Sequence, residues 1–314
     1  MSDHRLTLMT VHAHPDDESI GTGGTMAKAV AAGHRVVLVT CTRGEMGEIV
    51  IPELDTEEHH RRLGEMRAHE LEAAMGELGV TEWENLGYRD SDMMGRPGNH
   101  DPRCFWQANL DEAIGRLVWL VRRDRPHVIT TYNDFGGYGH PDHIRTHQVA
   151  VGAFARAGDP AWYPEQLAPE AGGSGPTLDA GGVLPWAPLK LYEQAMPASL
   201  RQTMAERVAA LGIQSPWQPP ADATPEQLAE YEAFMAKLLV PDESITTRVE
   251  IGSVIERKWH ALRRHATQIG PENTFMAFGL EGWREAWTTE SYILRESRVP
   301  VTTPETDLFT GIPA

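Results

Sequence analysis

The segment LTLMTVHAHPDDE, residues 6–18, joins a short apolar run directly to a cluster of histidines and carboxylates. The run covers residues 6–11, and an apolar run of this length that stops at a polar loop is typical of a buried strand. A helical stretch follows over residues 24–32 and stops at Gly33, a residue type common just past a helix C-terminus. Residues 36–40 are again apolar. Strand, helix and strand in this order predict two parallel strands joined by a crossover helix.

The same alternation continues along the chain. Helices are predicted over residues 56–78, ending at Gly79, and over residues 110–123. Strands are predicted at residues 85–86 and 127–132. Alternation of this kind predicts an α/β fold, with a Rossmann-like, mostly parallel sheet that has helices on both faces. In such sheets, ligands bind beyond the carboxyl ends of the strands.

The sequence pattern of the second half of the chain predicts a smaller C-terminal α+β part that completes the same domain. Its expected elements are strands at 189–192 and 244–251 and helices at 200–211, 225–239 and 254–266. The stretch 158–188 is rich in Gly, Pro and Ala, which indicates a surface excursion or a lid and not a domain linker. We therefore expect a single domain over residues 1–298, followed by an extended Pro/Thr-rich tail over residues 299–314.

Charge and composition narrow the class of protein. The 28 Lys and Arg residues against 45 Asp and Glu residues give a net charge of −17, which disfavours nucleic acid and anionic membranes as partners. No segment approaches the ~20 apolar residues that span a bilayer, and the start lacks a signal-peptide pattern, so we expect a cytoplasmic protein. Two cysteines, Cys41 and Cys104, make neither a disulfide framework nor a cysteine zinc site.

Two loops predicted at strand carboxyl ends carry the chemistry: HAHPDDE at residues 12–18 and GGYGHPDH at residues 136–143. Each packs imidazoles and carboxylates around a proline that fixes the local φ angle. A catalytic ion of the zinc type needs three nitrogen or oxygen ligands and one open position. Neither loop alone offers three well-separated ligands, but the two together do if they meet at one sheet edge. A carboxylate left over beside the ion can take a proton from water.

Other interpretations of these residues stay open at this point. Paired Asp16 and Asp17 at a helix start also serve as a cap and compensate the helix dipole. Gly21, Gly23 and Gly24 suggest the dinucleotide site of an oxidoreductase, but they follow the acidic cluster, which repels phosphate. A non-catalytic sugar-binding protein is a third alternative, but the presence of Asp16 and His140, which can transfer protons, argues against it.

The two loops, together with VTCTRGEMGE, YRDSDMMG, RPHVITTY and HATQ, resemble the PIG-L/LmbE-like zinc deacetylases. The similar segments are spread over most of the chain. Within the family, the chain is most similar to two branches, the N-acetylglucosaminyl-inositol deacetylases and the mycothiol S-conjugate amidases. The resemblance implies metal-dependent hydrolysis of an amide on a small, sugar-like substrate. It implies Zn²⁺ as the cofactor, with Fe²⁺ as an alternative for the same ligands.

The resemblance also implies roles for residues of the two loops. His14, Asp17 and His143 match the zinc ligands, and Asp16 matches the general base. His140 matches the residue that steadies the oxyanion or protonates the leaving amine.

Further roles follow from the same resemblance. Asp142 is expected to orient His140, and Tyr138 matches a mobile tyrosine that polarises the substrate carbonyl. His147 lies one helical turn beyond the last zinc ligand and is an alternative fourth ligand, although we favour packing because a catalytic zinc keeps one position open. The histidine of HATQ has no role that follows from the residues. The positions that match contacts to the sugar and inositol are Glu48, Arg67 and Asp90.

Details near the two loops bear on the substrate. Ile20-Gly21 lacks the lysine of the amidase branch, and Gly139 before HPDH matches the deacetylase branch. PWAPLKLY and HATQIGPEN, by contrast, are more similar to the amidase branch. We predict deacetylation of an N-acetylglucosaminide such as N-acetylglucosaminyl-inositol, with the mycothiol S-conjugate amidase as the alternative. The residues do not predict an oligomeric state.

Overall fold

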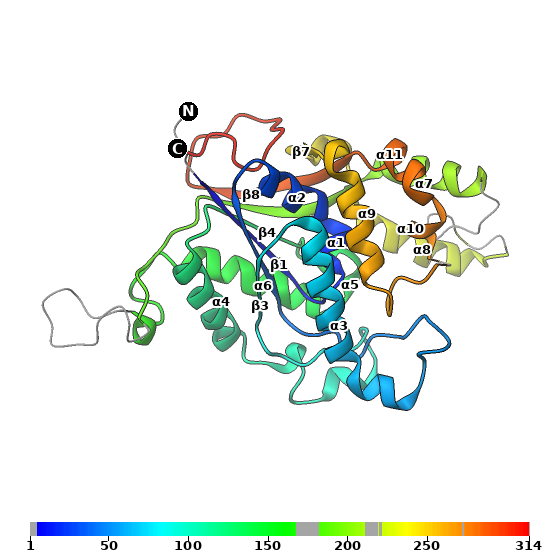
Figure 1. Cartoon of the computed structure of the whole chain (residues 1–314), viewed down its shortest axis with the longest axis horizontal. Helices are drawn as coiled ribbons and strands as arrows, with labels where there is room; N and C mark the ends of the chain where they lie inside the picture. The colour runs from blue at the N-terminus through cyan, green and yellow to red at the C-terminus, as the bar shows by residue number, and fades with distance from the viewer. Residues whose placement is uncertain (1–4, 168–181, 211–218, 220–221, 272, 314) are drawn as a thin grey trace, which may run out of the picture.

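The computed structural model describes residues 5–167, 182–210, 219, 222–271 and 273–313 (Figure 1). An eight-stranded sheet in the order β3-β2-β1-β4-β5-β8-β7 forms its centre, and β6 pairs with β5 outside this path. Neighbouring strands among β1 to β5 are parallel, whereas β8 is antiparallel to both β5 and β7. The predicted class, an α/β fold with a mostly parallel sheet, is confirmed. The strands are β1 (Thr7–His12), β2 (Arg35–Thr40), β3 (Glu82–Asn85), β4 (Val128–Thr131), β5 (Lys190–Pro197), β6 (Leu239–Val240), β7 (Thr247–Glu250) and β8 (Thr289–Ser297).

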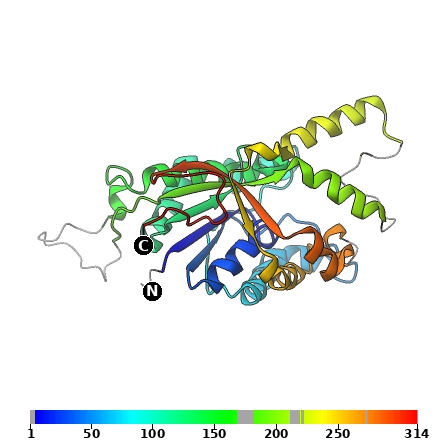
Figure 2. The same cartoon turned by 90° about the horizontal axis from the view of Figure 1, so that it is seen from above.

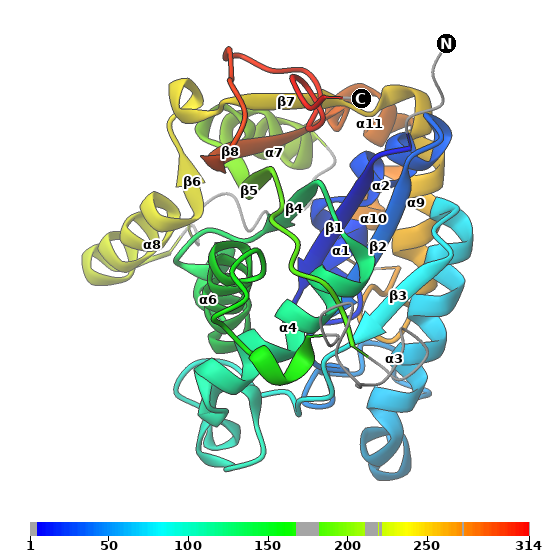
Figure 3. The same cartoon turned by 90° about the vertical axis from the view of Figure 1, so that its left-hand side faces the viewer.

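Helices cover both faces of the sheet, as Figure 3 shows. Side chains of β1 alternate between the two resulting cores: Leu8 packs with the first group of helices, and Met9 packs with the second. All six residues of β1 are buried, which explains its nearly continuous apolar run. The first group is α2 (Gly23–Ala31), α3 (Glu57–Leu78) and α9 (Ile255–Arg264), and the second is α4 (Leu110–Asp124) and α6 (Pro141–Arg156).

The strand order reverses next to β1, because β2 and β3 lie on one side of it and β4 and β5 lie on the other. Open α/β sheets form their ligand crevice at such a switch point, beyond the carboxyl ends of the strands. The loop after β1 and the loop after β4 both leave the sheet there. The topology therefore brings the two predicted loops to one place.

Within the described residues, the C-terminal half contains four α-helices and strands that the sequence patterns do not predict: the strands β6 and β8 and the short helices α10 (Thr274–Ala277) and α11 (Gly279–Ala286). An ion pair of Arg201 with Glu232 joins α7 (Ala198–Ala210) to α8 (Pro225–Leu238), and both helices extend away from the sheet (Figure 2). Residues 168–181 of the predicted surface excursion and the last residue of the predicted helix 200–211 lie outside the described residues. The remaining α-helices are α1 (Asp17–Gly21) and α5 (Gly136–Gly139).

The segment after residue 298, expected to be an extended tail, folds back on the sheet. Lys190 at the start of β5 is fully buried, and its ammonium lies 2.5 Å from Glu305 Oε1. The hydroxyl of Tyr192 donates to the other oxygen of Glu305 at 2.6 Å, and Leu308 belongs to the core. A buried ammonium needs a charged partner, and the end of the chain supplies it. The predicted domain boundary at residue 298 stays a prediction.

Within the part of the chain that the structure describes, no helix is long and apolar enough to cross a bilayer.

Candidate active site

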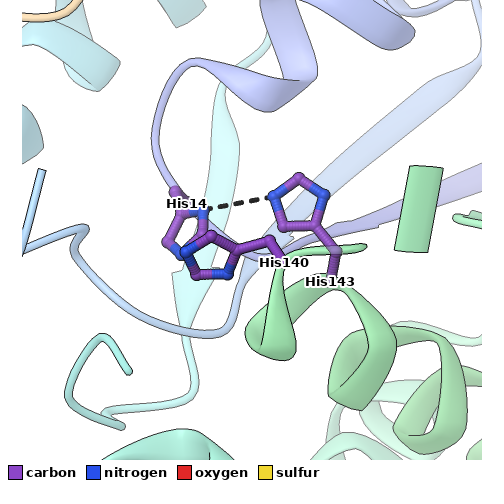
Figure 4. Close-up of side chains that lie close together, drawn as sticks. All are labelled: His14, His140 and His143. Atoms are coloured by element: carbon purple, nitrogen blue, oxygen red, sulfur yellow. Dashed lines mark hydrogen bonds between the residues drawn. The ribbon is translucent and has the colours of Figure 1, made fainter. Parts of the chain in front are cut away.

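The loops after β1 and β4 meet at the switch point of the sheet. Figure 4 shows the rings of His14, from the loop after β1, and of His140 and His143, from the start of α6, gathered in one place. All three side chains are buried. The helix α6 starts here because His140 caps it and Pro141 occupies its first turn. The two predicted loops therefore form one site.

Three ligand-type atoms form a nearly equilateral triangle: His14 Nδ1, Asp17 Oδ2 and His143 Nε2. The two nitrogen atoms lie 3.3 Å apart, and the Asp17 oxygen lies 3.4 Å from the first and 3.3 Å from the second. Ligands placed about 2.0–2.1 Å from a tetrahedral zinc ion lie about 3.3–3.4 Å from one another. The spacing of this ligand triangle therefore fits one divalent ion and leaves a fourth position for a reactant.

A carboxylate fixes the ring of His14. Nε2 of His14 lies 3.2 Å from Asp142 Oδ2, so Nδ1 is the ring nitrogen that joins the ligand triangle. Asp142 is fully buried and is held in turn by the backbone N–H of Ser91 at 2.9 Å and by the Ser91 hydroxyl. A carboxylate behind a ligating imidazole fixes its tautomer and orientation. The carboxylate of Asp142 contacts His14, whereas its backbone N–H donates to Nδ1 of His140, so the expectation that Asp142 orients His140 stays a prediction that rests on this backbone contact.

Two other groupings also bring ligand-type atoms within 4.8 Å of one another. Both include His140, whose Nδ1 already accepts a backbone hydrogen bond at 3.1 Å. One of them adds Asp142, which is engaged with His14 and Ser91. We favour the ligand triangle because its three atoms have the spacing of a tetrahedral site. The two groupings are His14, His140 and His143, and His14, Asp90, His140 and Asp142.

His147 lies outside the ligand triangle. Its Nδ1 donates to the backbone carbonyl of Tyr132 at 2.9 Å. The Tyr132 ring stacks on His143 with centroids 4.2 Å apart and planes 22° apart, and its hydroxyl accepts the Ala13 N–H at 3.0 Å. Tyr132 therefore contacts both a ligand-type histidine and the loop after β1. It is the last residue of the segment RPHVITTY, but the resemblance gives it no role.

His140 faces the site as a neutral hydrogen-bond donor. Because its Nδ1 accepts the N–H of Asp142, the ring proton lies on Nε2. Burial, and then the neighbouring His14 and His143, lower the pKa of His140 to about 2. The ring therefore donates through Nε2–H and carries no extra proton at neutral pH.

Asp16 lies beside the ligand triangle in a rare backbone conformation, with φ at 116° and ψ at −34°. Few residues other than glycine adopt a positive φ, and such outliers gather at functional sites. Its Oδ1 lies 3.2 Å from Nη2 of Arg67. Burial raises the pKa of Asp16 to about 6, although the positive charge of Arg67 opposes the shift. A carboxylate with a pKa near neutrality can both accept and return a proton.

The three residues expected to contact the sugar are not equivalent. Arg67 is 3% exposed and holds the loop in place, because it donates to the carbonyl of Gly44 at 2.9 Å and to that of Pro15. Asp90 is also buried, with Oδ1 3.8 Å from Nε2 of His14, the ring nitrogen that faces away from the ligand triangle. Glu48 is exposed, and among the described residues no hydrogen bond or ion pair joins its carboxylate to the other two. Their contacts with a substrate stay a prediction.

Tyr138 stands at the open side of the site. Its side chain is 39% exposed, and its ring centroid lies 4.8 Å from that of His143. Burial of the hydroxyl end, and then the charges of Asp17 and Asp16, raise the pKa of Tyr138 well above its usual value. The hydroxyl therefore keeps its proton and is a donor. The neighbouring Gly137 has a φ of 73°, a conformation that would strain most other residues.

A pocket of about 530 Å³ opens beside the ligand triangle. Asp17, Tyr138 and His143 line it where it meets the site. Much of the remaining wall is apolar and comes from the C-terminal half of the chain, so this half shapes the space around the reacting group. The apolar lining includes Ile20, Met196, Leu200, Leu238 and Trp287.

Comparison of the whole sequence with known proteins gives the same family as the motifs. The profile of the family described as PIG-L: GlcNAc-PI de-N-acetylase matches residues 9–154, which include both loops. A protein of Geodermatophilus obscurus named 1D-myo-inositol 2-acetamido-2-deoxy-alpha-D-glucopyranoside deacetylase is 43% identical, over 98% of this chain and 98% of its own. The chain belongs to the PIG-L family. A PIG-L relative of the same name from Thermobifida fusca is 41% identical, over 98% of this chain and 100% of its own.

Solved structures similar to this PIG-L chain share its fold. The N,N'-diacetylchitobiose deacetylase from Pyrococcus horikoshii has a TM-score of 0.58 at 20% identity, covering 92% of this chain and 83% of its own. The 4-carboxy-2-hydroxymuconate hydratase from Pseudomonas putida has a TM-score of 0.57 at 18% identity, covering 95% of this chain and 99% of its own. Since one is named a deacetylase and the other a hydratase, the fold alone does not select the reaction. The site residues must decide it.

Proposed function

We propose that this PIG-L protein is a deacetylase that hydrolyses the N-acetyl amide of an N-acetylglucosaminide such as N-acetylglucosaminyl-inositol. The observation that carries the proposal is the ligand triangle, whose spacing fits a tetrahedral metal ion. Asp16 stands beside it as a base. The substrate is supported by relatives that are 43% and 41% identical over nearly the whole chain and are named for this reaction.

Zn²⁺ is the proposed ion, with Fe²⁺ as the alternative, because two imidazoles and one carboxylate suit both. His14, Asp17 and His143 would hold it. When bound, such an ion supplies a Lewis acid that polarises a carbonyl and makes water easier to deprotonate.

The proton transfers use the side chains of the protein. Asp16 accepts a proton from the attacking water as the new carbon–oxygen bond forms. The Nε2–H of His140 and the hydroxyl of Tyr138 donate to the carbonyl oxygen as negative charge develops on it. Because the pKa of His140 is lowered to about 2, Asp16 is the better source of the proton that leaves with the amine. Breakage of the carbon–nitrogen bond then yields acetate and the free amine of the sugar.

Product release tests the proposal. Metal-loaded protein incubated with N-acetylglucosaminyl-inositol is expected to release acetate and primary amine in equal amounts, and a chelator is expected to stop the reaction. Absence of amine from every N-acetylglucosaminide offered, at full metal occupancy, would overturn the proposed function.

The activity is expected to fall as the pH drops through the pKa of Asp16, which burial raises to about 6 in the metal-free protein. Asp16 acts as a base, so its active form is the carboxylate. That form predominates above its pKa and is lost below it, which gives an acidic limb in kcat/KM. A bound cation favours the carboxylate and moves the limb to lower pH. Profiles of the unaltered protein and of Asp16→Asn check the assignment, since a limb retained by the variant belongs to another group.

A second function is favoured by one observation, the size of the pocket beside the ligand triangle. The methyl of an acetyl group is comparable to a water molecule, whose share of the liquid is about 30 Å³. The pocket holds about 530 Å³. An amidase that removes a bulky acyl group, as from a mycothiol S-conjugate, would use this space.

We expect a higher kcat/KM for the acetamide than for a mycothiol S-conjugate, because Gly139 and Ile20-Gly21 match the deacetylase branch. Leu200→Trp narrows the pocket and separates the two activities. It is expected to lower kcat/KM about tenfold for the conjugate, because overfilling a packed space typically costs about 1–3 kcal/mol. For the smaller acetamide, kcat/KM is expected to change less than about twofold. Leu228→Trp on the exposed face of α8 is the matched control. If the unaltered protein cleaves the conjugate faster, the amidase is the main function.

A further inference from the structure

The peptide unit between Pro15 and Asp16 is held from both sides. Its carbonyl oxygen accepts a hydrogen bond from Arg67 on α3, and its N–H donates to Glu18 Oε2 at 2.9 Å. The orientation of this peptide plane sets the φ angle of Asp16, which is 116°. A conformation this rare persists only where the surroundings determine it. The two hydrogen bonds are the contacts that do so here.

Glu18 takes its own position from a distant part of the chain. Its Oε1 accepts a hydrogen bond from Nε2 of His265 at 2.8 Å and from the hydroxyl of Ser19 at 2.6 Å. Glu18 and His265 are both fully buried and 247 residues apart. His265 directly follows α9, a helix packed against α2 and α3. The position of this imidazole is therefore fixed by the core.

Stability alone is a poor explanation for this pair. Burying both members of an ion pair costs desolvation that their attraction often does not recover. His265 Nδ1 is buried and finds no hydrogen-bond partner among the described residues, which adds to that cost. The pair nevertheless contacts the backbone of the residue that the proposed function makes the base.

We propose that Glu18 and His265 are positioning residues: with Arg67, they clamp the peptide plane between residues 15 and 16 and so aim the Asp16 carboxylate at the reacting water. The clamp explains why a histidine of HATQ, far from the metal-binding loops in sequence, is buried beneath them. It rests on the proposed role of Asp16 as base. Neither Glu18 nor His265 touches the substrate in this arrangement.

Two substitutions of His265 form a matched pair. Glutamine places its amide nitrogen near the position of Nε2 and can still donate to Glu18, whereas asparagine places it near Nδ1 and cannot reach. His265→Asn is expected to lower kcat about tenfold to a hundredfold, as misplacement of a reacting group does, with KM and metal content unchanged. His265→Gln is expected to recover most of that loss. Equal kcat values for the two variants would overturn the clamp.

Glu305→Gln controls for the general effect of disturbing a buried ion pair. Glu305 pairs with Lys190 at the amino end of β5, whereas the site lies beyond the carboxyl ends of β1 and β4. The variant is expected to lower the melting temperature without changing kcat. A parallel loss of kcat in Glu305→Gln and His265→Asn would show a purely structural role for His265.

A crystal structure of His265→Asn gives a readout that does not depend on activity. The clamp predicts that Asp16 relaxes from its positive φ to a negative one. A retained positive φ overturns the clamp even if the enzyme is active. The two proposals can also fail separately. If Asp16 relaxes to a negative φ in the variant but the unaltered protein hydrolyses no amide, the clamp is supported and only the proposed function is contradicted.

Discussion

Asp16→Asn is expected to lower kcat about 10²- to 10⁴-fold, the usual cost of removing a general base. The amide cannot accept a proton from water, but it has nearly the size of the carboxylate. Asparagine also tolerates positive φ better than most residues, so the loop conformation is expected to survive. Metal content, measured by elemental analysis, is expected to stay near one ion per chain, because three-ligand sites bind one.

Asp92→Asn is a matched control, since Asp92 is also a non-glycine residue with positive φ, at 63°. It is expected to keep nearly full activity. Near-normal turnover by Asp16→Asn would show that another group takes the proton. Glu18 is poorly suited to that role, because its two oxygens already accept hydrogen bonds from His265, Ser19 and the Asp16 backbone.

His143→Ala is expected to abolish activity through loss of the metal. Removing one corner of the ligand triangle leaves only two ligands. Loss of a partner behind a ligand already costs roughly 10- to 100-fold in metal affinity, so loss of the ligand itself is expected to cost more. Metal content after dialysis and the dissociation constant measured by competition with a chelator both report the change.

His147→Ala is the control on the same face of α6, one helical turn away. Because His147 donates to the Tyr132 carbonyl and lies outside the ligand triangle, this variant is expected to keep its metal. The reverse result, with metal lost from His147→Ala and kept in His143→Ala, would exchange the two residues in the ligand set.

The sequence patterns predict the first half of the fold well, because its strands are buried on both faces and its helices end at clear signals. The helix predicted over residues 56–78 is observed as Glu57–Leu78, with Thr56 as its cap and Gly79 in the left-handed conformation after it. Strands at β1, β2 and β4 are found within one residue of their expected limits. The meeting of the two loops follows from parallel topology, which puts strand carboxyl ends at one edge.

The partners within the site are not predictable in the same way, because they depend on contacts between distant residues. Asp142 lies next to His140 and His143 in sequence, yet its carboxylate contacts His14, 128 positions away. The pairing of His265 with Glu18 has no local signal at all. The strand β8 is missed for a related reason: half-buried positions along it give no continuous apolar run.

The contact of Glu305 with Lys190 has a consequence for biosynthesis. Ribosomes release a chain from its N-terminus, and β5 therefore emerges 115 residues before the carboxylate that neutralises its buried ammonium. Closing a loop of that length costs conformational entropy before any contact repays it. The strands β1 to β4 can collapse with their helices earlier, but the Lys190 ammonium must stay in water until residue 305 has left the ribosome. A nascent polypeptide that stalls between codons 297 and 305 contains every described strand of the sheet but lacks the carboxylate partner of Lys190, so burying this ammonium costs desolvation that nothing offsets.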